Sequence, residues 1–173
     1  MRKSITKSPG AAYNEPTFGS IPWETPMMVL TKDGATANAN FNMSAGAFGP
    51  PMSNYLVARQ FGFEIPENAT IEGITADIRC VKHGMSPGMD CAVKLEKAGW
   101  VGGDFRNILE PWPTVLEYRR HGGHNDLWGG TWTPADINHY GFGVAIAAST
   151  SMGTALSIDH VLVTITYSEP DQD

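Results

Sequence analysis

The sequence is poor in cysteine, in charge and in long apolar runs. Its 173 residues include 2 cysteines, and 17% of the residues are charged. Two cysteines are too few for a disulfide framework, so we interpret Cys80 and Cys91 as small apolar side chains that are buried. No uncharged apolar run approaches the roughly 20 residues that a membrane-spanning helix needs. These absences predict a globular chain that has no membrane partner.

Basic residues are also in short supply. There are 12 Lys and Arg against 18 Asp and Glu, which gives a formal net charge of -6. Proteins that bind nucleic acid gain affinity by neutralising phosphates with basic side chains, so we expect no nucleic-acid partner. The first ten residues are basic but lack the apolar stretch of about 7 to 15 residues that a secretory signal requires. We therefore expect the protein to be made and kept in a cytoplasm.

Prolines and glycines are concentrated near the start of the chain. Residues 1–26 contain prolines at positions 9, 16, 22 and 26 and glycines at 10 and 19, which interrupt helices and central strands. We predict an extended N-terminal arm that a neighbouring subunit holds in place. Residues 27–31 are predicted to form an edge strand, and residues 35–51 a long loop. Residues 1–50 are thus predicted to be arm and loop, and residues 51–173 the folded domain.

Short Val- and Ile-rich runs of strand length begin near residue 54. The clearest run alternates over residues 74–81, with Ile74, Ala76, Ile78 and Cys80 on one face, as a half-buried strand requires. A turn at residues 83–90 should join this strand to the next in a hairpin. The six strands predicted in this part of the chain cover residues 55–63, 74–81, 91–99, 114–119, 142–148 and 159–167.

Helix signals are confined to residues 133–138, where Thr133 can act as N-cap and Pro134 suits the first helical position. With seven to nine strands expected in total and one short helix, the fold class is all-β. We predict an antiparallel, jelly-roll-like β-sandwich with an extended N-terminal arm.

One short motif suggests a hydrolase. The stretch from Gly84 to Gly88 places Ser86 where a nucleophile elbow would have its serine, and such an elbow uses the backbone N–H of the following residue. Here that residue is Pro87, which has no N–H. We therefore predict a loop without catalytic function, and we assign no catalytic residue elsewhere.

A second motif suggests a metal site. His121, His124 and Asp126 are ligand types for zinc or another divalent ion, but their spacing matches no recognised zinc pattern. We interpret this segment as a solvated loop and keep the three residues as weak metal candidates. The prediction is that the protein binds neither a metal ion nor a cofactor.

The tryptophans leave two interpretations open. There are 5 of them, and several lie next to predicted strand ends. An indole buries a large area in a core or subunit interface while its N–H still finds a partner, whereas an exposed indole can stack on a sugar. The candidates for subunit or glycan contact are Trp23, Trp112, Trp128 and Trp132.

Four segments, at residues 63–74, 127–138, 142–146 and 158–167, carry a resemblance to a known family. In order and spacing they resemble small bacteriophage virion proteins found among head-decoration, fibre and tail-appendage components. The resemblance implies a jelly-roll-like sandwich in a symmetric assembly, without catalytic residues to carry over. It also implies synthesis in a host bacterial cytoplasm and a final location in the virion.

Two functions are compatible with these observations, and neither is enzymatic. The first is a virion structural protein, either a capsid decoration (cement) protein or a fibre or tail-appendage subunit. It would act through contacts with its own copies, as a homotrimer or higher symmetric oligomer, and with other virion proteins such as the major capsid or tail proteins. The alternative is a receptor-binding module of a tail fibre that recognises a host surface glycan. Exposed aromatic side chains in a groove would favour the second.

Overall fold

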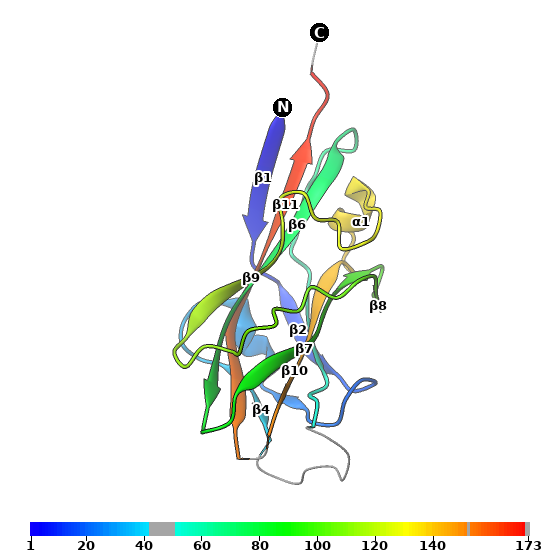
Figure 1. Ribbon diagram of the computed structural model, residues 1–173. Helices are drawn as coiled ribbons and strands as arrows, with labels where there is room; N and C mark the ends of the chain where they lie inside the picture. The colour runs from blue at the N-terminus through cyan, green and yellow to red at the C-terminus, as the bar shows by residue number, and fades with distance from the viewer. Residues whose placement is uncertain (42–50, 152, 172–173) are drawn as a thin grey trace.

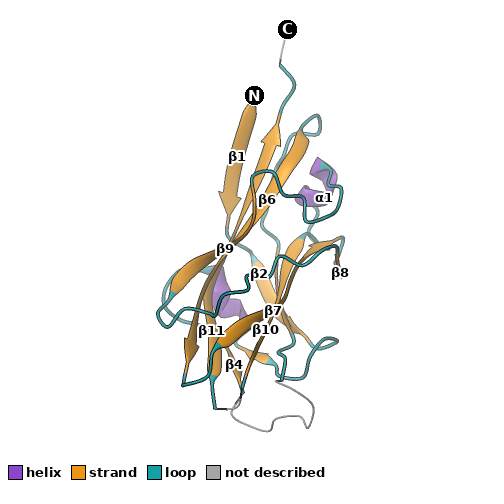
Figure 2. Cartoon of the chain, in the orientation of Figure 1, coloured by secondary structure: helices purple, strands orange, loops and turns teal. Residues whose placement is uncertain are grey.

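Two antiparallel β-sheets pack face to face in the computed structural model, which describes residues 1–41, 51–151 and 153–171 (Figures 1 and 2). Sheet A has the strand order β3-β4-β11-β6-β9, with β1 pairing β11, and sheet B has the order β2-β5-β10-β7-β8. The strands of sheet A are β1 (Arg2–Lys7), β3 (Trp23–Glu24), β4 (Ala37–Asn40), β6 (Thr70–His83), β9 (Glu117–Gly123) and β11 (Ala155–Ser168). The strands of sheet B are β2 (Ala11–Glu15), β5 (Tyr55–Arg59), β7 (Gly88–Lys97), β8 (Trp100–Gly102) and β10 (Gly143–Thr150). The predicted all-β, jelly-roll-like sandwich is confirmed.

The core lies between the sheets and follows the alternation of the sequence. Ile74, Ala76, Ile78 and Cys80 of β6 are each at most 1% exposed, so the predicted inner face of this strand is confirmed. Burial of a large apolar side chain stabilises the fold by about 1.5 to 3 kcal/mol. Both cysteines are free thiols, and Cys91 is only half-buried. Burial raises the pKa of Cys80 to about 12.

The predicted hairpin at residues 83–90 is wrong. The strand before it, β6, pairs with β11 and β9 of sheet A, whereas the strand after it, β7, pairs with β10 and β8 of sheet B. The chain therefore crosses between the sheets at this point. Alternation indicates which face of a strand is buried, and both strands bury a face against the same core, so it does not identify the hydrogen-bonded neighbour.

The predicted N-terminal arm is also wrong. Strand β1 pairs with β11 over its whole length, from Arg2 opposite Ser168 to Lys7 opposite Val163, and β2 pairs with β5. Pro9 and Gly10 lie between the two strands, where the chain passes from sheet A to sheet B. Because both strands end before a proline, neither needs a proline N–H in its ladder. The N-terminal segment is thus part of this chain's own sandwich.

Two smaller expectations about the first fifty residues also fail. The predicted edge strand at 27–31 is a 3-10 helix, η1 (Pro26–Leu30), which has the proline in its first turn. The predicted loop at 35–51 contains β4, and its residues 42–50 lie outside the described part of the chain. Strands β1 to β4 all lie in the first fifty residues, and with them the described residues contain eleven strands, above the seven to nine expected.

Strands β6 and β11 contain 14 residues each, and with β1 they project beyond the rest of the molecule, so that both termini lie at the same end (Figure 1). Helix α1 (Pro134–Asn138) is capped as predicted, since Thr133 accepts a hydrogen bond from the backbone N–H of Asp136. Within the described ranges, no helix is long and apolar enough to cross a membrane.

Candidate ligand-binding surface

Three of the four tryptophan candidates lie in the core. Trp23, Trp112 and Trp128 are 3%, 3% and 2% exposed. Each indole N–H is satisfied within the chain, by the carbonyl of Asn54, the carboxylate of Asp90 and the carbonyl of Ile74 respectively. These three side chains are therefore core residues, and their burial argues against the predicted contact with a subunit or a glycan, although Trp128 also borders one of the hollows described below. Proximity to a strand end does not reveal whether an indole turns toward the core.

Trp132 is half-buried and partly covered. Its N–H donates to the carbonyl of Leu127 at 3.0 Å, and its ring meets Phe142 edge to face at a centroid distance of 5.6 Å. The ammonium group of Lys97 lies 4.6 Å from the ring centroid of Trp132. This amine also donates to the carbonyl of Thr131. One face of Trp132 therefore already carries a cation.

Trp100 is the residue that sequence reasoning missed. It is 80% exposed and opens β8, directly after a two-residue turn in which Ala98 and Gly99 both have positive φ, at 51° and 85°. Such a turn joins adjacent strands of a hairpin, and here it pairs Trp100 with Lys97. A tryptophan that follows a tight turn at the start of an edge strand has no strand beyond it to cover its ring. Its position directly after the turn was therefore the sequence signal that could have predicted an exposed indole.

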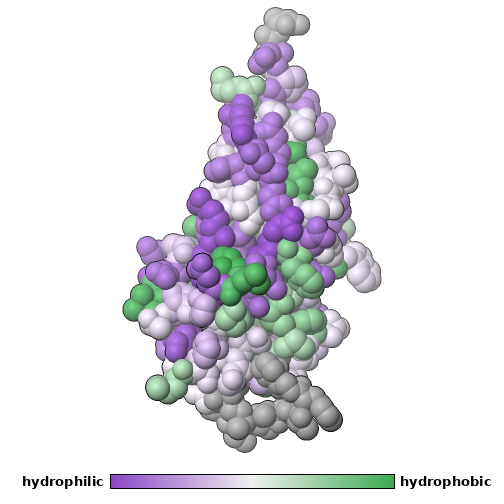
Figure 3. Space-filling view, in the orientation of Figure 1, coloured by the Kyte–Doolittle hydropathy of each residue, from purple (hydrophilic) through white to green (hydrophobic). Residues whose placement is uncertain are grey.

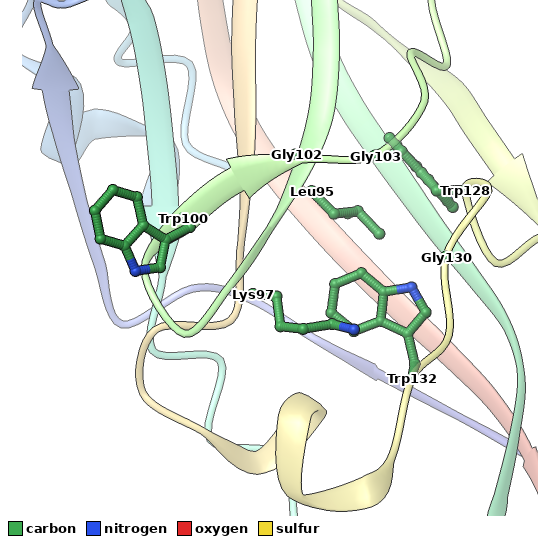
Figure 4. A pocket seen from close by; sticks show the side chains of 8 residues that line it. All are labelled: Leu95, Lys97, Trp100, Gly102, Gly103, Trp128, Gly130 and Trp132. Atoms are coloured by element: carbon green, nitrogen blue, oxygen red, sulfur yellow. The ribbon is translucent and has the colours of Figure 1, made fainter.

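Two hollows meet at Trp100. The first, which we name the Trp132 hollow, encloses about 240 Å³. Its lining consists of Leu95, Lys97, Trp100, Gly102, Gly103, Trp128, Gly130 and Trp132. Figure 4 shows Lys97 between Trp100 and Trp132, with Leu95 and Trp128 above Lys97 in the view. Three of the lining residues are glycines, so backbone is open to a ligand beside the indoles.

The second hollow, which we name the Tyr55 hollow, encloses about 490 Å³ on the face of sheet B that points away from the core. Its lining consists of Tyr13, Glu15, Thr17, Tyr55, Glu96, Gly99, Trp100 and Val101. A separate apolar cluster lies on this outer face, where Tyr55 and Val57 pack with Ala92, Ala145 and Ala147. Trp100 belongs to both linings and therefore joins the hollows into one surface.

The carboxylates of the Tyr55 hollow differ in their surroundings. Glu96 is 2% exposed and forms a two-point ion pair with Arg59, at 2.6 and 2.9 Å. The hydrogen bond to Glu96 is also the main reason that the pKa of Arg59 is raised. Glu15 instead accepts hydrogen bonds from the backbone N–H and the hydroxyl of Thr17. Within the described ranges, no basic side chain lies within ion-pair distance of Glu15.

The weak metal candidates are not brought together. His121 bonds to Asp90 at 2.8 Å, His124 lies 3.2 Å from the hydroxyl of Thr166, and Asp126 forms a two-point ion pair with Arg106. In the part of the chain that the structure describes, no three His, Cys, Asp or Glu side chains are grouped as a metal ion would require. Each candidate has a structural partner instead.

Ser86 lies in the segment that crosses between β6 and β7. Its backbone N–H donates to the hydroxyl of Thr154 at 3.3 Å. Strands flank the segment on both sides, so it lacks the strand-to-helix turn that a nucleophile elbow requires.

No family model and no curated protein matches the chain. Two solved structures overlap with it at 11% sequence identity. One, described as TmCBM61 in complex with β-1,4-galactotriose, has a TM-score of 0.45 and covers 88% of this chain and 86% of its own. The other, described as "CBM4 structure and function", has a TM-score of 0.41 and covers 92% of both chains. Likeness at this level is too distant to indicate a shared ligand.

Proposed function

We propose that the protein is a non-catalytic binding module that recognises carbohydrate on the surface centred on Trp100. The observation that carries the proposal is the 80% exposed indole of Trp100, which borders both the Trp132 hollow and the Tyr55 hollow. Flat aromatic faces stack on pyranose rings, and a few fixed polar groups around them set orientation and specificity.

Both hollows combine apolar and polar groups in the way that a sugar needs. In the Trp132 hollow the indoles are accompanied by the Lys97 ammonium group and by open glycine backbone. The Tyr55 hollow offers the phenol ring of Tyr13 with the carboxylate of Glu15 and the hydroxyl of Thr17, and the 7% exposed Tyr55 lines it as well. A sugar chain that lies across Trp100 would contact both.

The position of Trp100 is fixed before a ligand binds. Strand β8 pairs with β7 from Trp100 opposite Lys97 to Gly102 opposite Leu95. The turn before it is held by a hydrogen bond of 2.9 Å from the N–H of Gly99 to the carbonyl of Gly141. A preorganised contact surface loses little conformational entropy on binding, which favours affinity.

We further propose that this module works on a phage particle as the receptor-binding part of a fibre or tail appendage. This step is supported by the sequence resemblance at residues 63–74, 127–138, 142–146 and 158–167. The other function considered, a capsid-decoration or structural subunit that acts through its own copies and other virion proteins, is supported by the same resemblance. Of these two functions, the exposed aromatic surface favours glycan recognition.

A glycan array tests the proposal. The wild-type protein should bind a restricted set of oligosaccharides, and Trp100→Ala should lose at least about tenfold in affinity, because aromatic contacts of this kind carry much of the binding free energy. Tyr140→Ala is the matched control, since Tyr140 is 71% exposed but lines neither hollow. Binding that is absent from the wild type, or unchanged in Trp100→Ala, would overturn the proposal.

A further inference from the structure

We infer that the Tyr55 hollow takes a cationic group, so that the glycan bound at Trp100 carries a free amino group, as an unacetylated hexosamine does. This inference rests on the proposed function and concerns one of its two hollows. It follows from the charges of the lining, from its aromatic rings and from the contrast with the Trp132 hollow.

The lining of the Tyr55 hollow contains two carboxylates and no basic residue. Arg59, which lies beside it, neutralises Glu96 through the two-point ion pair. Glu15 is left as the negative charge at the hollow. Its three hydrogen bonds from Thr17 leave acceptor capacity, because an ionised carboxylate has about four acceptor positions. A charged donor such as an ammonium group forms a hydrogen bond to a carboxylate that is about twice as strong as one from a neutral donor.

The aromatic rings favour a cation as well. Tyr13 and Trp100 line the hollow with Glu15, whereas Tyr55 is 7% exposed and stacks on Phe18. Aromatic faces attract cations through their quadrupole. The chain already uses this chemistry, since the guanidinium group of Arg59 lies 4.9 Å from the ring centroid of Tyr13. A ligand amine would make the same kind of contact from the open side of the hollow.

The Trp132 hollow presents a different charged group. Lys97 lies on the ring of Trp132 and lines that hollow, and it pairs at 3.8 Å with Asp136, which is not part of the lining. An amine there would meet an ammonium group and no carboxylate in the lining. The two sides of Trp100 therefore differ in the charged group that they present, which orients the ligand with its amino sugar in the Tyr55 hollow.

The test compares two ligands that differ in the charged group. Glucosamine and N-acetylglucosamine tetramers are titrated calorimetrically into the wild-type protein, at a pH below the pKa of the amine. We expect the glucosamine tetramer to bind at least about tenfold more tightly, the scale of one hydrogen bond to a charged group. Glu15→Gln should remove this preference, because it should weaken binding of the glucosamine tetramer by a larger factor than binding of the acetylated tetramer. Glu24→Gln, which changes an exposed carboxylate on β3, should keep the preference.

The outcomes separate this inference from the proposed function. Equal or tighter binding of the acetylated tetramer, no binding of the glucosamine tetramer, or a preference that persists in Glu15→Gln would each overturn the inference. If the wild type binds both tetramers equally and Trp100→Ala binds neither, the carbohydrate-binding function stands while the cationic specificity is wrong.

Discussion

Asp90 and His121 join the two sheets through a buried hydrogen bond. Asp90 belongs to β7 of sheet B and His121 to β9 of sheet A. Their atoms Oδ2 and Nε2 are 2.8 Å apart, and the side chains are 3% and 1% exposed. Asp90 also accepts hydrogen bonds from the backbone N–H of Ile108 and from the indole N–H of Trp112, each at 2.8 Å. One carboxylate thus organises three segments between the sheets.

Replacing this carboxylate should destabilise the fold strongly. Asp90→Ala leaves the three buried donors without their acceptor, and we expect the free energy of unfolding to fall by about 3 kcal/mol or more. The control is Asp77→Ala, which removes the partner of Arg120, a side chain that is 63% exposed. That change should cost about 1 kcal/mol or less. Urea denaturation measures both, and equal effects would contradict the structural role of Asp90.

Acid should weaken the same contact. Burial alone would raise the pKa of Asp90, but the hydrogen bonds from His121, Ile108 and Trp112 lower it below the ordinary value of 3.8. A lowered folded-state pKa contributes stability that is fully present above the unfolded pKa and is lost as the pH falls through the folded value. Asp90→Asn should therefore flatten the decline in unfolding free energy at acidic pH below about 4. An unchanged decline would show that other carboxylates cause it.

His160 should produce a separate decline at higher pH. Burial lowers the pKa of His160 from 6.5, and its ring contacts the hydroxyls of Ser8 and Tyr118 at 2.9 and 2.7 Å. Because the unfolded chain then binds the proton more readily, stability should fall as the pH drops below about 6.5. His160→Gln should remove this part of the pH dependence. Denaturant titrations at about pH 8 and pH 5 compare the two proteins, and a parallel loss in both would contradict the assignment.

Deleting the N-terminal segment should unfold the protein. Removal of residues 1–26 takes away β1, β2 and the buried Trp23, and loss of one such core aromatic costs about 3 to 5 kcal/mol by itself. Removal of residues 1–8 takes only β1, which lies on the projecting end (Figure 1), and should lower the unfolding temperature less. If the longer deletion unfolds at the same temperature as the whole chain, the pairing of β2 is wrong.

The sequence predicts the inner faces of the strands better than their partners. Alternation at Ile74 to Cys80 and the capping pattern at Thr133 are local signals, and both were confirmed. The pairing of β6 with β11, and of β1 with β11, depends on contacts between distant segments. Prolines in the first 26 residues indicate breaks, and short edge strands fit between breaks as well as an extended arm does. Local pattern could not distinguish these arrangements.

The sequence predicted that aromatic residues would form the candidate site, but it did not predict which residues these are. Tryptophan content indicated aromatic contacts, but burial selects Trp100 and half-buried Trp132 rather than Trp23 or Trp112. The Tyr55 hollow brings together residues from β2, β5, β7 and β8, which the sequence does not place side by side.

Figure 3 shows predominantly hydrophilic surface over the projecting strands, with the larger hydrophobic areas in the middle and lower parts of the molecule.

The most direct test of the central claim measures whether a bound glycan covers Trp100. Acrylamide quenching of indole fluorescence suits this purpose, because Trp23, Trp112 and Trp128 are buried whereas Trp100 is 80% exposed. With an oligosaccharide identified on the array, quenching of the wild-type protein should fall toward the level of Trp100→Ala. The change in that variant should be smaller, because the partly buried Trp132 is the indole that remains at the surface. A glycan that binds while leaving wild-type quenching unaltered would contradict the account, since Trp100 would then lie outside the contact surface.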